Sequence, residues 1–218
     1  TWITRQTQIG TIVPNEETHS FPINNHAMRS FNTLSLTIIT LALMYPLHAS
    51  DDTGERLFAS ICANCHGSRG EGNFELKAPS IASMPAWYVT RQLGKFRTDI
   101  RGNHTKDTSG QAMRAIADSL KEEQVASLAS YIAKLEAHPS KKTLDGDLRN
   151  GKYLFENICI NCHRFNASGD LVFGSPPLTG LQDWYILAQL TKFRAGVRGA
   201  HKDDEKGAKM HQLTGYLK

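Results

Sequence analysis

Two short cysteine–histidine strings carry the clearest chemistry in this sequence: Cys62-Ala-Asn-Cys65-His66 and Cys159-Ile-Asn-Cys162-His163. Two thiols separated by two residues can form thioethers with the two vinyl groups of one haem, and the histidine that follows can bind its iron. All four cysteines of the chain lie in these strings, so no thiol is left for a disulfide, a zinc site or a nucleophile. The sequence therefore predicts two covalently bound haem c groups, with His66 and His163 as axial ligands of the iron.

Two methionines at matched spacing indicate the second axial ligand of each iron. Met113 and Met210 each lie 47 residues after their motif histidine, and such recurrence is not expected of methionines that only fill a core. The alternatives are His104 and His201, each 38 residues after the motif histidine, but they lie in polar segments and favour surface roles. Histidine–methionine coordination fills both axial positions, which suits electron exchange and leaves no place for a substrate.

The matched spacing belongs to an internal duplication. Residues 51–121 align with residues 148–218 at a constant offset of 97, with 25 identities in 71 positions and no gap. Such a repeat predicts two copies of one structural unit. Apolar residues at helical spacing make each copy all-α. The helices predicted in the first copy cover residues 54–63, 87–96 and 121–135, and a loop is predicted over residues 98–110.

The repeat also sets the expected domain boundaries. We expect a first domain over residues 51–137, a linker over residues 138–147 and a second domain over residues 148–218. The second copy ends at the counterpart of Lys121. We therefore expect it to lack its C-terminal helix.

The N-terminal fifty residues are not expected to join this fold. Residues 28–49 have the order of a secretory signal peptide, with Arg29 before an apolar run and Ala49 at the expected cleavage point. An uncleaved N-terminal anchor is the alternative. Residues 1–27 are polar and without periodicity, which predicts an upstream or disordered leader. Export to the periplasm is the expected outcome.

Other repeated residues are candidates for supporting roles around each haem. The carbonyl groups of Pro79 and Pro176, each 13 residues after a motif histidine, could accept a hydrogen bond from its imidazole. Lys95 and Lys192 are typical of solvated helix faces. The candidate donors to the haem propionates are Trp87, Tyr88, Arg97, Trp184, Tyr185 and Arg194. For the two tryptophans, core packing is an equal alternative.

The charge of the chain excludes one class of partner. The net charge of +4 is mild and no cluster of lysine and arginine exists, so nucleic acid is not an expected partner. Residues 51–140 carry 11 basic and 11 acidic residues, whereas residues 141–218 carry 12 and 8. The surplus on the second copy could attract an acidic partner, but a solvated surface is the favoured explanation.

Beyond single residues, the sequence resembles the cytochrome c4 family of dihaem class I cytochromes. The resemblance covers nearly all of residues 51–218. It rests on Cys62-Ala-Asn-Cys65-His66-Gly67, Gly70-Glu71-Gly72-Asn73, Ala78-Pro79, Gln92-Leu93 with Phe96-Arg97, and Met113 with Ala117. The second copy departs from the pattern at Arg164-Phe165-Asn166, and it is also similar to cytochrome c domains fused to oxidase subunits.

The resemblance implies two tandem class I cytochrome c domains related by a pseudo-twofold axis, with haem propionates near the interface. It implies a periplasmic electron carrier rather than an enzyme. A quinol-oxidising complex or a dehydrogenase would be the donor, a terminal oxidase the acceptor, and peripheral association with a membrane is compatible with this role. The alternatives are a dihaem enzyme of the peroxidase or thiosulfate dehydrogenase type and a fixed cytochrome subunit of a larger redox complex.

Overall fold

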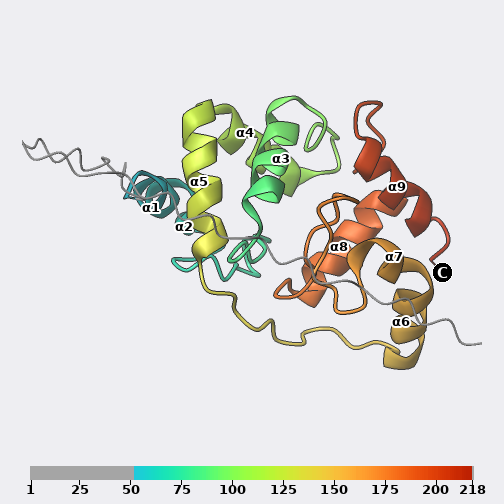
Figure 1. Ribbon diagram of the computed structural model, residues 1–218. Helices are drawn as coiled ribbons and strands as arrows, with labels where there is room; N and C mark the ends of the chain where they lie inside the picture. Colours follow the sequence, from blue (N-terminus) through green and yellow to red (C-terminus); the bar gives the residue numbers. More distant parts are fainter. Residues whose placement is uncertain (1–51, 218) are drawn as a thin grey trace, which may run out of the picture. The chain divides into compact units, whose positions relative to one another are not determined.

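The computed structural model describes residues 52–217, which form helices joined by loops (Figure 1). Within this range no β-strand occurs, and two isolated antiparallel bridges, Asn73 with Ala78 and Asp170 with Ser175, close equivalent turns in the two copies. The expected all-α fold is therefore confirmed. The predicted signal peptide over residues 28–49 and the predicted leader over residues 1–27 lie outside the described residues.

Each copy begins with a helical segment that ends at its motif histidine. In the first copy, α1 (Asp52–Leu57) passes through a π-helical turn, η1 (Phe58–Cys62), into α2 (Ala63–His66). The second copy repeats this order, and its elements are α6 (Leu148–Leu154), η2 (Phe155–Cys159) and α7 (Ile160–His163). The wide turn ends at the first cysteine of each motif, and such turns are frequent at functional sites. The helix predicted over residues 54–63 is present and extends to His66.

The remaining helices form the walls of the two copies. Two of them, α3 (Ala86–Arg97) and α5 (Glu122–Lys134), match predicted helices closely. The helix α4 (Thr108–Asp118) carries Met113 and starts inside the segment predicted as a loop, because the Asp107 side chain caps it by accepting from Gly110 N at 3.0 Å. Their counterparts in the second copy are α8 (Asp183–Arg194) and α9 (Glu205–Thr214).

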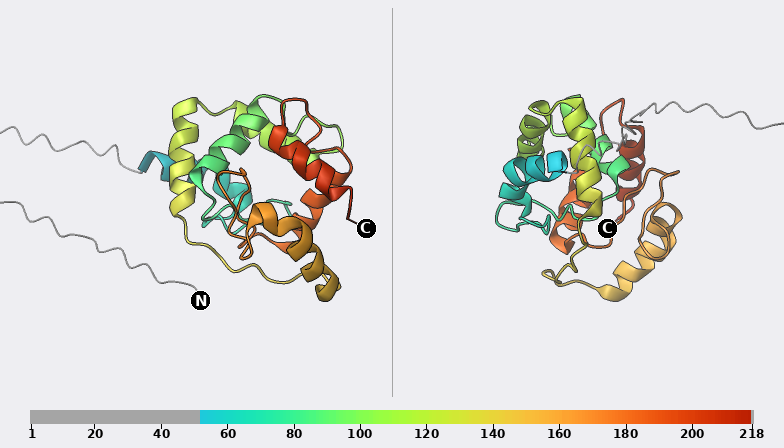
Figure 2. Two further views of the ribbon diagram at one scale, coloured as in Figure 1. Left: turned by 45° about the vertical axis from the view of Figure 1, so that its right-hand side comes forward. Right: turned by 60° about the vertical axis from the view of Figure 1, so that its left-hand side comes forward.

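The core of the first copy lies where α5 packs against α1 and α3, as Figures 1 and 2 show from different directions. Phe58, Val125 and Leu128 are almost fully buried there. Gly54 lets α1 approach α5 closely, because a Cβ at this position would lie 2.4 Å from the carbonyl oxygen of Ser127. In the second copy, α8 packs against α9.

The connection between the copies is extended and is fixed at one point. The carboxylate of Asp183, at the start of α8, accepts hydrogen bonds from the backbone N–H and hydroxyl of Thr143, each at 2.6 Å, and from Leu144 N at 2.8 Å. These bonds hold the pKa of Asp183 well below its usual range. In the part of the chain that the structure describes, no helix has the length and apolar character needed to cross a membrane.

Candidate haem-binding sites

Each motif opens onto its own cavity. The first cavity has a volume of about 230 Å³ and is lined by Cys62, Cys65 and His66. The second has a volume of about 360 Å³ and is lined by the matching residues, which are Cys159, Cys162 and His163. Thiols and imidazole that the sequence placed in one string therefore face one space in each copy.

The motif histidines are held in the form that a metal ion needs. Nδ1 of His66 lies 2.7 Å from the carbonyl oxygen of Pro79, and Nδ1 of His163 lies 3.1 Å from that of Pro176. A carbonyl oxygen only accepts, so Nδ1–H donates and the Nε2 lone pair remains for the iron. Burial lowers the pKa of both imidazoles, and the hydrogen bonds to the proline carbonyls oppose this shift only in part. Both histidines are therefore neutral at neutral pH, the form in which an imidazole can bind a metal ion.

Before a haem is attached, burial keeps the first cysteine of each motif as a protonated thiol. Burial raises the pKa of the Cys62 thiol to about 11 and also raises that of Cys159. A thiol with such a pKa is a poor nucleophile and a poor thiolate ligand at neutral pH. Its sulfur can still add to a vinyl group, which fits thioether attachment.

The methionines predicted as ligands line the same cavities as the motif residues. Met113 of α4 lines the first cavity, and Met210 of α9 lines the second. Met84 also lines the first cavity and belongs to its buried core, and its counterpart in the second copy is Leu181. His104 and His201 line neither cavity, and each accepts a hydrogen bond at Nδ1 from the backbone two residues later.

Of the candidate propionate donors, only the tyrosines lie at the cavities. Tyr88 and Tyr185 each line both cavities. Trp87 and Trp184 line neither; Trp184 packs against Phe74 of the first copy, with ring centroids 5.5 Å apart. The two remaining candidates point elsewhere: Arg97 pairs with Glu122 at 2.7 Å, and Arg194 donates to the carbonyl oxygen of Leu217 at 3.0 Å.

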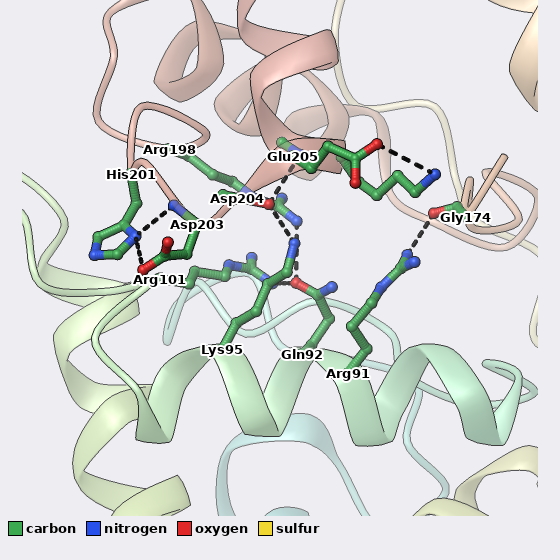
Figure 3. A network of polar contacts seen from close by, with 12 residues as sticks. Arg91, Gln92, Lys95, Arg101, Gly174, Arg198, His201, Asp203, Asp204 and Glu205 are labelled. Atoms are coloured by element: carbon green, nitrogen blue, oxygen red, sulfur yellow. Dashed lines mark hydrogen bonds and ion pairs between the residues drawn. The ribbon is translucent and has the colours of Figure 1, made fainter.

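Charged residues join the two copies in a reciprocal pattern. Lys95 of α3 pairs with Asp204 of the second copy (Figure 3). Lys192 of α8 pairs with Asp107 of the first copy, with Nζ 2.6 Å from Oδ1. The lysine side chains are 16% and 21% exposed, and both carboxylates are 3% exposed. The prediction of solvated lysines is wrong, because the polar faces of α3 and α8 contact the other copy instead of water.

Two arginines cross the junction in the same reciprocal way. Arg101 donates to the hydroxyl of Tyr185 at 3.3 Å, and Arg198 donates to that of Tyr88 at 3.4 Å. Two glutamines bind both arginines and complete the network, namely Gln92 and Gln189. Each of these ion pairs and hydrogen bonds therefore has its counterpart across the junction, as a pseudo-twofold axis requires.

Glycines fix the loops that carry these arginines. Gly102 and Gly199 have φ values of 84° and 82°, a region that favours glycine. A Cβ at either position would lie 2.4 Å from the carbonyl oxygen of Gly110 or Gly207. The close approach places Arg101 and Arg198 beside the N-termini of α4 and α9.

Each cavity is completed by side chains from the other copy. The first cavity is lined in part by Leu181, Tyr185, Gln189 and Lys192 of the second copy. The second cavity is lined in part by Tyr88, Arg91, Gln92 and Lys95 of the first. The two sites share one wall, so a charge on one copy acts on the site of the other.

The residues present fit a haem whose propionates reach this wall. Arg101 lines the first cavity and Arg91 the second, and the Nε atom of each is buried without a hydrogen-bond partner. A buried guanidinium N–H without a partner is costly, and a carboxylate is the group that satisfies it best.

Sequence reasoning placed the two lysines of the reciprocal pairs on solvated surfaces, and it assigned no role to the two aspartates or the two arginines. All of them are identities of the 97-residue repeat: Lys95 with Lys192, Asp107 with Asp204, and Arg101 with Arg198. These residues could have been found from the sequence, because they are polar, identical in both copies and not explained by haem binding. The sequence did not say that they contact each other across the copies.

The interface pairs make stability depend on pH. Burial disfavours the ionised form of Asp107, but the hydrogen bond and charge of Lys192 outweigh it and hold the pKa of this carboxyl below its ordinary value of 3.8. The ionised carboxylate stabilises the folded state fully above pH 3.8. This stabilisation is lost as the pH falls through the pKa of Asp107 in the folded protein. In thermal unfolding, the stability difference between wild type and Asp107→Asn should be largest at neutral pH and shrink below pH 3.8. A difference that is constant from pH 7 to pH 3 would contradict the ion pair.

These features define the class: a two-domain c-type cytochrome with one haem site in each domain. The sequence profile of the cytochrome c family matches residues 52–136 and again residues 148–217. The chain belongs to the cytochrome c family, and the expected resemblance to dihaem cytochrome c4, with two covalently bound haem c groups, is confirmed. The chain is therefore a dihaem c-type cytochrome.

Three similar proteins illustrate the range of the family. The FixP subunit of a cbb3-type cytochrome c oxidase from Bradyrhizobium diazoefficiens is 28% identical, and the match covers 67% of this chain and 53% of that protein. A thiosulfate dehydrogenase electron acceptor from Thiomonas intermedia is 30% identical over 64% of this chain and 65% of that protein. The chain thus matches less than two thirds of the length of either relative. The structure of reduced recombinant cytochrome c4 from Pseudomonas stutzeri shares the fold, with 23% identity, a TM-score of 0.62 and coverage of 78% of this chain and 91% of that one.

Proposed function

We propose that this chain is an exported carrier that moves single electrons between respiratory partners in the periplasm, toward a terminal oxidase. The observation that carries the proposal is the matched lining of the two cavities. Each contains a neutral motif histidine, held by a proline carbonyl, and a methionine at the same position in the repeat. His66 and Met113 would bind one iron and His163 and Met210 the other, which would leave no coordination position for a substrate.

The residues of the chain prepare each site for electron exchange. Haem iron supplies the one-electron ferric–ferrous couple. Pro79 and Pro176 hold the imidazole rings in one orientation, which keeps the coordination geometry the same before and after electron exchange. Tyr88 and Tyr185 line both cavities and accept hydrogen bonds across the junction. They keep the two sites adjacent, as transfer between them requires.

The similar proteins support the partner class. One is named as an oxidase subunit and another as the electron acceptor of thiosulfate dehydrogenase, so a role between a dehydrogenase and an oxidase suits this chain. The four surplus basic residues lie in residues 141–218. An acidic docking surface on one partner would be attracted to them. The rate of association between this chain and that partner should then fall as the salt concentration increases.

Sulfur coordination can be tested with matched methionine variants. Ferric holoprotein should show sulfur-to-iron charge-transfer absorption from both haems. Met113→Leu should remove about half of this absorption, and Met210→Leu the other half. Met84→Leu is the control, because Met84 lines the first cavity but has a leucine as its counterpart in the repeat. It should leave the absorption unchanged.

Two results would contradict the proposal. If Met84→Leu removes the absorption and Met113→Leu does not, the ligand of the first iron is misassigned. A high-spin ferric component at one haem in wild-type protein would show an open iron, which fits an enzyme better than a carrier.

A further inference from the structure

Among the charged side chains that each copy contributes to the cavity of the other, one has no charged counterpart. Lys95, Arg101, Gln92 and Tyr88 all recur in the second copy, but the residue that corresponds to Arg91 is Ala188. Arg91 lies on α3 of the first domain (Figure 3). Of the two cavities, it lines only the second. It is therefore a cation that one domain contributes to the haem site of the other.

The environment of Arg91 holds it in place without neutralising it. One terminal nitrogen donates to the carbonyl oxygen of Gly174, in the second domain, and the guanidinium lies over the Trp87 ring, 4.7 Å from its centroid. Burial lowers the pKa of Arg91. Among residues 52–217 it forms no ion pair with a carboxylate, and the neighbouring Asp204 already pairs with Lys95.

The wall of the second cavity carries a net positive charge, which favours the binding of an anion. It holds five cations and one carboxylate, whereas the wall of the first cavity holds three cations and one carboxylate. The cations of the second cavity are Arg91, Lys95, Arg198, Lys206 and Lys209. Those of the first are Lys77, Arg101 and Lys192. The buried Nε of Arg91 has no partner, so a carboxylate entering this cavity would satisfy it and offset the cost of burying the charge.

We propose that Arg91 binds a propionate of the haem held by the other domain and raises the reduction potential of that haem selectively. The inference rests on the proposed function, since it needs a haem in each cavity. The ferric form carries one more positive charge than the ferrous form. A cation fixed at the edge of the second haem disfavours oxidation of its iron, and in a partly buried wall this effect is weakly screened.

The test is a redox titration of Arg91→Gln holoprotein, followed by visible absorption. Wild type should show two one-electron transitions. The second-domain transition is assigned with Met210→His, because replacing a methionine ligand by histidine lowers the potential. In Arg91→Gln, the equilibrium constant for reduction of the second-domain haem should fall about tenfold. This lowers its reduction potential by about 59 mV for a one-electron couple. The first-domain haem should shift much less.

Two further variants separate charge from structure. Arg91→Lys keeps the positive charge, so the reduction potential of the second-domain haem should stay close to that of wild type. Lys152→Gln is the matched control, since Lys152 lies in the second domain with its side chain 74% exposed. The same loss of charge there should move neither transition, because water and salt screen it.

The outcomes distinguish the two proposals. If Arg91→Gln shifts the second-domain potential no more than Lys152→Gln, or shifts both haems equally, the role of Arg91 is wrong while the carrier function stands. If the haems of the wild-type protein do not take up and release electrons reversibly, the carrier function itself is overturned. Should Arg91→Gln fail to fold, Ala188→Arg carries the test: it places the same cation at the matched position. It should raise the first-domain potential, and no shift there overturns the inference.

Discussion

Replacing Cys159 and Cys162 together by alanine should leave a protein with one covalently bound haem instead of two. The four cysteines are the only groups of the chain that can form thioethers, and each pair faces its own cavity. Haem that is not covalently bound is removed by acidified acetone. Haem per polypeptide after this extraction should therefore fall from two to one, and the mass of the denatured protein should fall by one haem.

The motif itself offers the control for this experiment. Asn161 lies between the two cysteines and is exposed, so Asn161→Ala should keep both haems. Alanine at Cys62 and Cys65 should give the reciprocal one-haem protein, with the haem in the second domain. Loss of both haems from either double variant would mean that the two sites do not load independently.

Asp107→Ala should be strongly destabilising, by about 3–5 kcal/mol, because it leaves the ammonium group of Lys192 in a largely buried wall without its partner. The same carboxylate caps α4, and loss of a cap contributes about 1 kcal/mol of that total. The free energy of unfolding from denaturant titrations of the holoprotein, followed by circular dichroism, measures this effect.

A second capping aspartate separates the ion pair from the cap. Asp147 caps α6 by accepting from Arg149 N and Asn150 N at 2.9 and 3.0 Å, but it is exposed and forms no ion pair among the described residues. Asp147→Ala should therefore cost only about 1 kcal/mol. Adding Lys192→Met to Asp107→Ala should recover part of the loss, because it removes the unpaired charge. Equal costs for Asp107→Ala and Asp147→Ala would show that the ion pair contributes nothing.

The helices were predictable to different degrees, for reasons of local chemistry. The stretches that became α3 and α5 have apolar residues at helical spacing and were predicted within two residues. The helix α4 was missed at its start, because residues 98–110 are polar and contain glycine, and only the cap from Asp107 to Gly110 shows where the helix begins. The π-helical turns before Cys62 and Cys159 left no sign in the apolar pattern.

The residues of the candidate site were also predictable to different degrees. Pro79 and Pro176 were predicted as hydrogen-bond acceptors from spacing, and the structure places both carbonyl oxygens at their histidines. Arg97 was predicted beside a propionate, but its guanidinium binds Glu122 instead. Repetition at a fixed offset shows that a residue is shared by both copies, but it does not show which way the side chain points.

The sequence by itself determined the covalent chemistry of this protein. Two cysteines and a histidine within five residues must face one haem wherever the chain folds, and the fixed offset of 97 residues makes the two sites alike. The tertiary structure alone decided that the sites share a wall. Lys95 meets Asp204 and Arg91 reaches the second cavity because the polar faces of α3 and α8 are buried against the other copy. Contacts between residues about 100 positions apart depend on that packing, which no local pattern records.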